Sequence, residues 1–245
     1  MRVGDITGEG DLDIVAVGVN GDIQVWNGDG AGGFTAGWSV RGYASSYDGE
    51  AVTLVDLDHD ALLDLVVADG YYPGQLFAGL LNDGSGGFDT SAPLSTPMPA
   101  AVPLTVTLGA HDIDGDGWED VLASGGFYTD WRLFLGAWSW DGSAWGPFMD
   151  LAEPTSSALT GVTAGDLDGD GDEDLFAANA LYMNGIFLFD EGGGVWSTTT
   201  VDLGLWYQSD IFPDPLAVGD LNGDGCGDLV WRTDEDVIVS HGSGC

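Results

Sequence analysis

The sequence predicts an all-β protein, a β-propeller of four-stranded antiparallel blades. Five acidic segments recur along its 245 residues, and the steps between their first aspartates are 51, 56, 54 and 54 residues. Short stretches rich in Val, Leu and Ile flank each segment, and a glycine-rich turn follows in each of the first four repeats. These stretches are too short for helices, so they predict strands. Four strands in a repeat of about 50 residues is the pattern of a propeller blade.

The strands of a repeat follow one another in a fixed order. The first precedes the acidic segment, as at Ala51–Val55, Leu104–Leu108 and Leu216–Val218. The second follows the segment, at Ile14–Val17, Leu65–Ala68, Val121–Ala123 and Leu229–Trp231. The third is predicted at Ile23–Trp26, Gln75–Leu81, Arg132–Ala137 and Ile186–Phe189. After the glycine-rich turn, the fourth strand begins at an aromatic residue, namely Phe34, Phe88, Trp145 or Trp196.

The whole chain, residues 1–245, is predicted to form one domain of five repeats. We expect the blades at about residues 1–48, 49–102, 103–157, 158–213 and 214–245. The fifth blade lacks its outer strand, because its third strand, Val237–Ser240, is the last apolar stretch. Two arrangements remain open. The chain is either a five-bladed ring with a thin last blade, which we favour, or part of a larger propeller or surface protein.

The charge of the chain excludes several classes of partner. Asp and Glu number 41 against 4 Lys and Arg, so the formal net charge is −37. Such a chain repels phosphate backbones and anionic lipid, so we expect no nucleic acid partner and no peripheral membrane binding. No apolar stretch approaches the ~18 residues of a membrane span, so direct insertion is not expected either. Ten Trp, ten Phe and seven Tyr argue against disorder.

The acidic segments have the composition of cation-binding loops. Each spans nine residues: Asp5–Asp13, Asp56–Asp64, Asp112–Asp120, Asp166–Asp174 and Asp220–Asp228. Oxygen-bearing side chains at positions 1, 3, 5 and 9 converge when the backbone coils tightly, and glycine at positions 4 and 6 permits that coil. Hard oxygen ligands in a flexible loop suit Ca²⁺. An EF-hand is the competing motif, but it needs Glu at position 12, where these loops have Ala123 and Ala177.

The loops, the strand that follows them and the later G-x-G-G-F turn resemble FG-GAP/VCBS repeats, the blades of integrin-α-like calcium-binding propellers. The resemblance covers essentially the whole chain, and it adds the main-chain carbonyl at position 7 to the ligand set. Three to five calcium ions are therefore expected. The implied ligands are Asp5, Thr7, Glu9, Asp11 and Asp13; Asp56, Asp58, Asp60, Leu62 and Asp64; Asp112, Asp114, Asp116, Trp118 and Asp120; Asp166, Asp168, Asp170, Asp172 and Asp174; and Asp220, Asn222, Asp224, Cys226 and Asp228.

Two of the loops depart from the pattern. The first has Thr7 and Glu9 at positions 3 and 5, and the second has His59 and Ala61 where glycines are expected, so the occupancy of these two loops is left open. The alternative to cation sites is a set of solvated acidic turns. The five loops hold 22 of the 41 acids, and such crowding of like charge is destabilising unless a cation offsets it.

The same chemistry suggests where the protein works. Extracellular modules bind Ca²⁺ at about 10⁻⁴–10⁻³ M, which cytosolic calcium does not reach. We therefore expect a secreted or cell-surface protein, in which calcium stabilises the scaffold. The function that fits best is a ligand-binding or adhesion module for a glycan or a protein. A purely structural domain of a larger surface protein is the alternative.

An enzyme is the less favoured class. The three histidines, His59, His111 and His241, lie in or beside the acidic loops or near the C-terminus, and no nucleophile accompanies them at a strained turn. A polysaccharide-cleaving site would need two acids outside the loops. The candidates are Asp69, Asp130 and Asp210.

Strand direction places the two cysteines on one side of the last blade. Cys226 is position 7 of the fifth loop, and Cys245 follows the third strand as the chain returns to the same edge. We predict a Cys226–Cys245 disulfide, worth about 3 kcal/mol in the chain-entropy model. Two unrelated small core residues are the alternative.

Strand direction also separates two faces of the propeller. The acidic loops and the turns between third and fourth strands lie on one face, and the remaining connections lie on the other. Tyr and Trp offer a large contact area with a polar group, which suits sugar rings and protein interfaces. Aromatic residues collect in the connections of the second face, although they could simply cover blade ends. The predicted ligand-binding residues are Tyr71, Tyr72, Tyr128, Tyr182, Trp206 and Tyr207.

Overall fold

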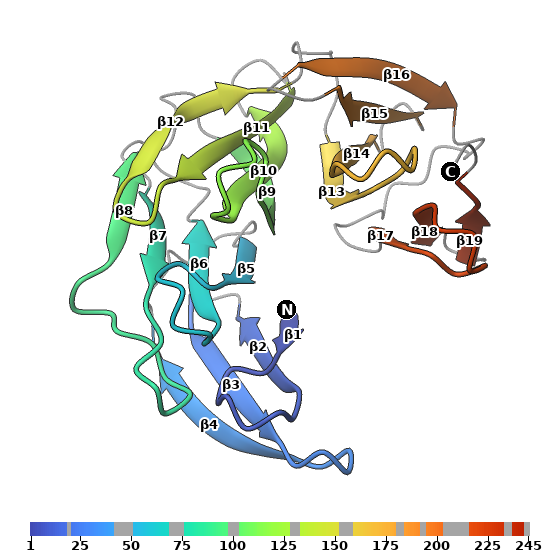
Figure 1. Ribbon diagram of the computed structural model, residues 1–245. Coiled ribbons are helices and arrows are strands. Elements are labelled where there is room, and N and C mark those ends of the chain that lie inside the picture. Colours follow the sequence, from blue (N-terminus) through green and yellow to red (C-terminus); the bar gives the residue numbers. More distant parts are fainter. Residues whose placement is uncertain are drawn as a thin grey trace.

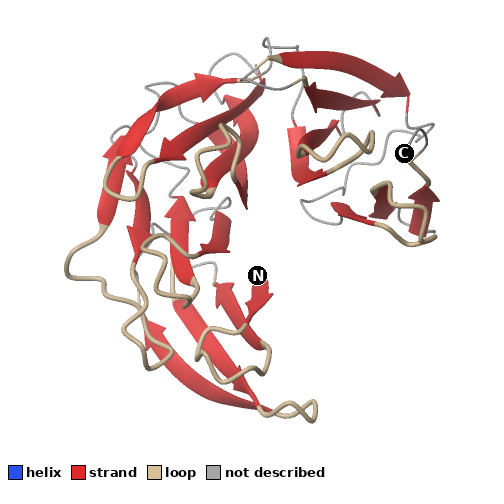
Figure 2. Ribbon diagram, in the orientation of Figure 1, coloured by secondary structure: helices blue, strands red, loops and turns tan. Residues whose placement is uncertain are grey.

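A computed structural model describes residues 1–18, 21–41, 51–68, 76–97, 103–127, 133–151, 159–179, 184–191, 195–202, 216–232 and 237–242. Every regular element in these ranges is a β-strand, as Figure 2 shows. In this part of the chain there is accordingly no helix long and apolar enough to cross a membrane.

Within the described ranges nineteen strands form five antiparallel sheets, and each sheet follows chain order. Blade 1 comprises β1 (Arg2–Gly4), β2 (Asp13–Val17), β3 (Ile23–Gly28) and β4 (Phe34–Val40). Blade 2 comprises β5 (Ala51–Val55), β6 (Asp64–Ala68), β7 (Leu76–Leu80) and β8 (Leu94–Pro97). Blade 3 comprises β9 (Pro103–His111), β10 (Asp120–Phe127), β11 (Leu133–Trp140) and β12 (Trp145–Asp150). Blade 4 comprises β13 (Leu159–Gly165), β14 (Asp174–Asn179), β15 (Asn184–Asp190) and β16 (Trp196–Asp202). Blade 5 has three strands, β17 (Leu216–Gly219), β18 (Asp228–Arg232) and β19 (Val237–Ser240).

The five blades form a β-propeller, as the repeat pattern predicts. Figure 1 shows the first strand of each blade nearest the centre and the fourth strand at the rim. Successive inner strands contact one another, β1 with β5, β5 with β9, β9 with β13 and β13 with β17. Within the described ranges no comparable contact joins β17 to β1, and Figure 1 shows blades 1 and 5 apart.

The hydrophobic core is divided between the blades. Four apolar clusters lie between successive blades, and the cluster between blades 4 and 5, around Leu167, Phe176 and Leu229, is the smallest. Blades 2, 3 and 4 therefore bury both faces against their neighbours, which is why a strand such as β6 of blade 2 is buried along its whole length.

One repeated position shows what a neighbouring blade covers. Position 2 of the acidic loop is buried in blades 1 to 4, at Ile6, Leu57, Ile113 and Leu167. The same position in blade 5, Leu221, is 60% exposed. The difference follows from the arrangement, because blades 1 to 4 each have a following blade packed on that face.

The outer strand of blade 2 differs from the sequence prediction. Phe88 does not begin a strand; it forms an isolated bridge with Asn82, and β8 begins only at Leu94. The chain turns between them because the Asp89 carboxylate accepts hydrogen bonds from the Ser91 backbone N–H (2.8 Å) and hydroxyl (2.6 Å).

Candidate metal centres

The five acidic loops share one backbone coil. Glycines at positions 4 and 6 have positive φ, for example 74° at Gly115 and 93° at Gly117. In the second loop His59 and Ala61 adopt the same left-handed conformation, with φ of 56° and 71°. The coil therefore forms even where the sequence lacks glycine, at the cost that a β-carbon brings to this region.

Position 1 holds the coil together from inside. In the third loop one carboxylate oxygen of Asp112 accepts the backbone N–H groups of Gly115 (2.8 Å) and Asp116 (3.1 Å), and the other accepts that of Gly117 (2.9 Å). Equivalent bonds recur at the first aspartate of the other loops. These local bonds explain why aspartate, with its short side chain, is favoured there.

Position 9 connects the loop to the rest of the blade. Asp120 is fully buried, and its two oxygens accept the backbone N–H groups of Ile113 (3.1 Å) and Trp140 (2.8 Å). Ile113 is position 2 of the loop and Trp140 ends β11, so one side chain ties the loop to the following glycine turn. The last aspartate of every loop makes the same pair of bonds. Sequence analysis missed this bracing role, although a fixed acid at the first residue of a buried strand was its signal.

Three carboxylates converge in each of the three middle loops. Positions 1, 3 and 9 offer oxygens that all lie within 4.8 Å of one another, and the groups are Asp56, Asp58 and Asp64; Asp112, Asp114 and Asp120; and Asp166, Asp168 and Asp174. The first and fifth loops have Thr7 and Asn222 at position 3, so each has two acids at these positions.

Position 5 accepts a backbone hydrogen bond within the coil. The carboxylates of Asp60, Asp116, Asp170 and Asp224 accept the backbone N–H of position 7, at 2.8–3.0 Å. Position 5 does not join the three groups of converging acids. Its role as a ligand, like that of the position 7 carbonyl, stays a prediction.

Burial and crowding make several of the converging carboxylates costly to ionise. Burial raises the pKa of Asp64 to about 6 and that of Asp120 to about 7, and the charges of neighbouring loop acids act in the same direction. Burial also raises the pKa of Asp114 and Asp168, and nearby aspartates contribute. A bound cation would offset both burial and the repulsion between neighbouring acids, since it supplies the opposite charge.

The donor set fits a hard divalent cation. Carboxylate oxygens are ligands that Ca²⁺ prefers. An ionised carboxylate has about four lone-pair sites, so the carboxylate of position 9 can accept two backbone hydrogen bonds and still coordinate an ion.

The first loop supplies an independent indication of a cation. The hydroxyl oxygen of Thr7, at position 3, is buried and has no hydrogen-bond partner. Such an orphaned oxygen is costly unless something else, such as a cation, satisfies it.

Adjacent loops contact each other across the blade boundaries. The imidazole of His59 stacks on Trp118 of the next loop, with ring centroids 3.6 Å apart and planes 7° apart. His111 Nδ1 lies 2.7 Å from an oxygen of Glu173, and this hydrogen bond lowers the pKa of Glu173. These two histidines therefore join neighbouring loops. The third, His241, lies 3.1 Å from Asp228.

Several predicted residues lie outside the described ranges. They are the six aromatic ligand-binding candidates Tyr71, Tyr72, Tyr128, Tyr182, Trp206 and Tyr207, and the acids Asp69, Asp130 and Asp210. Cys226 is buried and has no free thiol. Because Cys245 is also outside these ranges, the Cys226–Cys245 disulfide stays a prediction.

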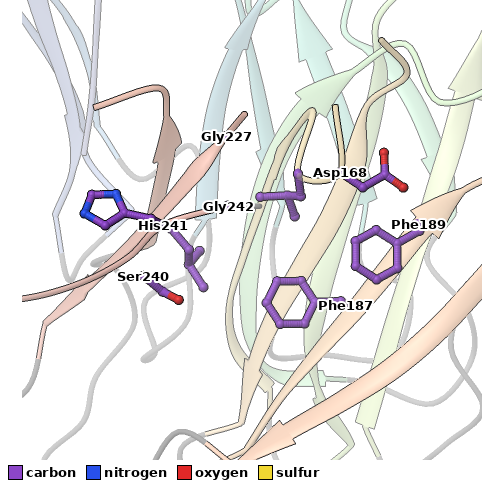
Figure 3. Close-up of a pocket in the computed structure, with 9 residues that line it drawn as sticks. Asp168, Phe187, Phe189, Gly227, Ser240, His241 and Gly242 are labelled. Carbon is purple, nitrogen blue, oxygen red and sulfur yellow. The ribbon is translucent and has the colours of Figure 1, made fainter. Parts of the chain in front are cut away.

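A pocket of ≈ 200 Å³ opens between blades 4 and 5 (Figure 3). In Figure 3 Phe187 and Phe189 lie on one side of it, and Ser240 and Gly242 on the other. Its remaining lining comes from Leu167, Asp168, Gly227, Leu229 and His241.

Comparison with known protein families gives one match. The model of the FG-GAP-like repeat matches three times, at residues 5–67, 112–177 and 166–231. Each match begins at the first aspartate of an acidic loop. Comparison with curated protein sequences gives no match.

Solved structures of similar fold include the following two. One comes from work on the recognition of non-reducing terminal N-acetylglucosamine by an Agrocybe aegerita lectin, with a TM-score of 0.65, 19% identity and 99% of this chain covered. The other is BBS1N in complex with ARL6DN, with a TM-score of 0.51, 12% identity and 94% of this chain covered. The alignments span 63% and 58% of those chains, so this chain corresponds to about three fifths of their length.

Proposed function

The chain belongs to the FG-GAP-like repeat family, and we propose that it is a calcium-stabilised β-propeller that works as a ligand-binding module outside the cell. The observation that carries the calcium part is the convergence of three carboxylates, within 4.8 Å, in each of three successive loops. Acids at this spacing, with burial raising the pKa of Asp64 and Asp120, favour a bound divalent cation over solvated turns.

Calcium has a structural task in this proposal. Positions 1 and 3 belong to the loop, whereas position 9 begins the second strand and is bonded to the glycine turn. An ion held by these positions would fix the loop to the blade at three to five repeated places. The residues proposed to hold it are those of positions 1, 3 and 9, with positions 5 and 7 completing the shell.

The ligand part rests on the fold and on the distribution of aromatic residues. A lectin is among the structures of similar fold, which favours a binding role for this propeller and a glycan as one class of ligand. A protein ligand is the other class. We propose that the binding face is the one opposite the acidic loops, where the connections contain Tyr71, Tyr72, Tyr128, Tyr182, Trp206 and Tyr207.

A glycan array tests the ligand class and the face together. The calcium-loaded protein is applied to glycans that differ in their non-reducing termini, N-acetylglucosamine included. We expect selective binding that the triple change Tyr72→Ala, Tyr128→Ala and Tyr207→Ala abolishes, while the Tm and the calcium stoichiometry stay unchanged. The matched control is Ser85→Ala, an exposed side chain in the glycine turn of blade 2, which should bind like the original protein.

The opposite outcomes are equally clear. If binding survives the triple change, or if only changes in the acidic loops remove it without unfolding the protein, the ligand face is the wrong one. If no glycan binds, the protein ligand class remains, and the same triple variant then serves as the control in a search for protein partners.

A further inference from the structure

The pocket between blades 4 and 5 occupies a position that an aromatic side chain fills elsewhere in the propeller. In blade 3 the first residue of the outer strand, Trp145, packs across the blade boundary. Its indole N–H donates to the Leu94 carbonyl of blade 2 (3.0 Å), and a β-carbon on Gly79 of β7 would lie 3.6 Å from its ring. This aromatic therefore rests on the third strand of the preceding blade.

The same arrangement recurs at the other blade boundaries. Phe88 of blade 2 belongs to the cluster that contains Val25 of β3, and Trp196 of blade 4 packs on the cluster that contains Ala137 of β11. Val25, Gly79 and Ala137 are equivalent positions. Each lies three residues before the residue whose backbone N–H binds the position 9 aspartate, namely Gly28, Asn82 or Trp140.

The equivalent residue in blade 4 is Phe187, three residues before Asp190. Phe187 lines the pocket, together with Phe189 of the same strand and Leu229, Ser240 and Gly242 of blade 5. The pocket therefore lies where the aromatic residue of an outer strand of blade 5 would pack. Its size agrees with this assignment, because ≈ 200 Å³ lies below the roughly 300–1,000 Å³ of pockets for drug-sized ligands and suits one side chain.

The neighbouring strand is able to pair with a partner. Among the described strands β19 pairs with β18 alone, whereas the third strands of blades 1 to 4 each pair with a fourth. Unpaired backbone groups along a strand edge are a template for strand addition. An edge that pairs with no other described strand, beside a pocket that suits an aromatic side chain, supports one type of occupant, an extended peptide.

We propose that blade 5 is an acceptor for an extended peptide strand that begins with Trp or Phe. The peptide backbone pairs with β19, and its aromatic side chain enters the pocket over Phe187. This completes blade 5 with a fourth strand and buries apolar surface of the smallest interblade cluster.

A synthetic peptide from this protein tests the proposal on the full chain. The peptide VWSTTTVD, residues 195–202, contains the outer strand of blade 4. We expect it to bind the calcium-loaded protein in isothermal titration calorimetry. A Trp196→Ser peptide lacks the aromatic group, and a Thr199→Pro peptide disturbs strand pairing, so both should bind at least tenfold more weakly.

A matched pair of protein variants locates the site. Ser240 lines the pocket, whereas Val239, the residue before it in the same edge strand, does not. Ser240→Trp should fill the pocket and abolish peptide binding, while Val239→Trp should leave the peptide affinity within a factor of two. Circular dichroism checks that both variants fold. The proposal is overturned if the original protein does not bind the peptide, if the Trp196→Ser peptide binds equally well, or if Ser240→Trp folds and still binds.

Discussion

At the scale of single residues, the last aspartate of each acidic loop has two tasks. Asp120 accepts two backbone hydrogen bonds in a fully buried position, and the same carboxylate converges with Asp112 and Asp114. The first task is structural and needs no metal, whereas the second is proposed to hold calcium. A substitution at this position should therefore affect stability even when calcium is removed.

Asp120→Asn tests this separation. The amide replaces one acceptor oxygen with a donor group that faces a backbone N–H, so a buried N–H loses its partner. We expect a loss of about 1–3 kcal/mol in the free energy of unfolding, measured by urea denaturation in excess EDTA. Asp116→Asn is the control, because its exposed side chain should change stability little in EDTA and affect only calcium affinity. Equal stability of the two variants in EDTA would contradict the bracing role.

The second loop gives another prediction at this scale. Ala61 has φ of 71°, a conformation that glycine adopts without penalty. Ala61→Gly should raise the free energy of unfolding by about 1 kcal/mol, since the strain removed exceeds the entropy that glycine adds to the unfolded chain.

Gly117→Ala is the matched opposite change, at the same loop position in blade 3. Its φ is 93°, and a β-carbon there would meet no atom within 4 Å, so only backbone strain should act. It should lower stability by about the same amount in a thermal or urea melt. Destabilisation by Ala61→Gly would show that the loop conformation is wrong.

At the scale of strands and blades, the neighbouring blade decides which apolar residues matter. Leu57 is fully buried and Leu221 is 60% exposed, although both occupy loop position 2. Leu57→Ala should cost about 2–5 kcal/mol, and Leu221→Ala less than about 0.5 kcal/mol. The midpoint of urea unfolding measures both. A large loss at Leu221 would mean that another part of the protein covers this face.

Much of the strand order and the blade arrangement could be predicted from the sequence. The repeat of acidic loop, apolar stretch and glycine turn predicts the four strands of each blade, because strand length and turn composition are local properties. The start of β8 at Leu94 was missed, since the Asp89–Ser91 turn has the same composition as the turns that precede strands. The pocket over Phe187 was also missed, because it depends on the packing of blade 4 against blade 5.

The candidate metal sites could likewise be predicted only in part from the sequence. The spacing of the acids predicts that side chains of positions 1, 3, 5 and 9 meet, and those of positions 1, 3 and 9 do so in three loops. That position 5 turns toward the backbone N–H of position 7 depends on the geometry of the coil, which spacing alone does not give. The bonds of Asp120 to Trp140 cross 20 residues and belong to the tertiary structure.

At the scale of the whole molecule, the blades share one electrostatic problem. The formal net charge is −37, and 22 of the 41 acids lie in the five loops. Each bound calcium ion would remove two negative charges where crowding is greatest. The stability of the propeller should therefore rise with the concentration of free calcium.

The most direct test is a calorimetric titration of the chelated protein with calcium, combined with melting curves at 0 and 10 mM Ca²⁺. We expect three to five ions per chain. If the sites bind at about 10⁻³ M, each adds about 1.4 kcal/mol at ten times that concentration, so three sites should raise the Tm by roughly 10 °C. Magnesium at the same concentration is the control for ionic strength and should raise the Tm less. No heat of binding, or the same Tm with and without calcium, would contradict the claim that calcium stabilises this propeller.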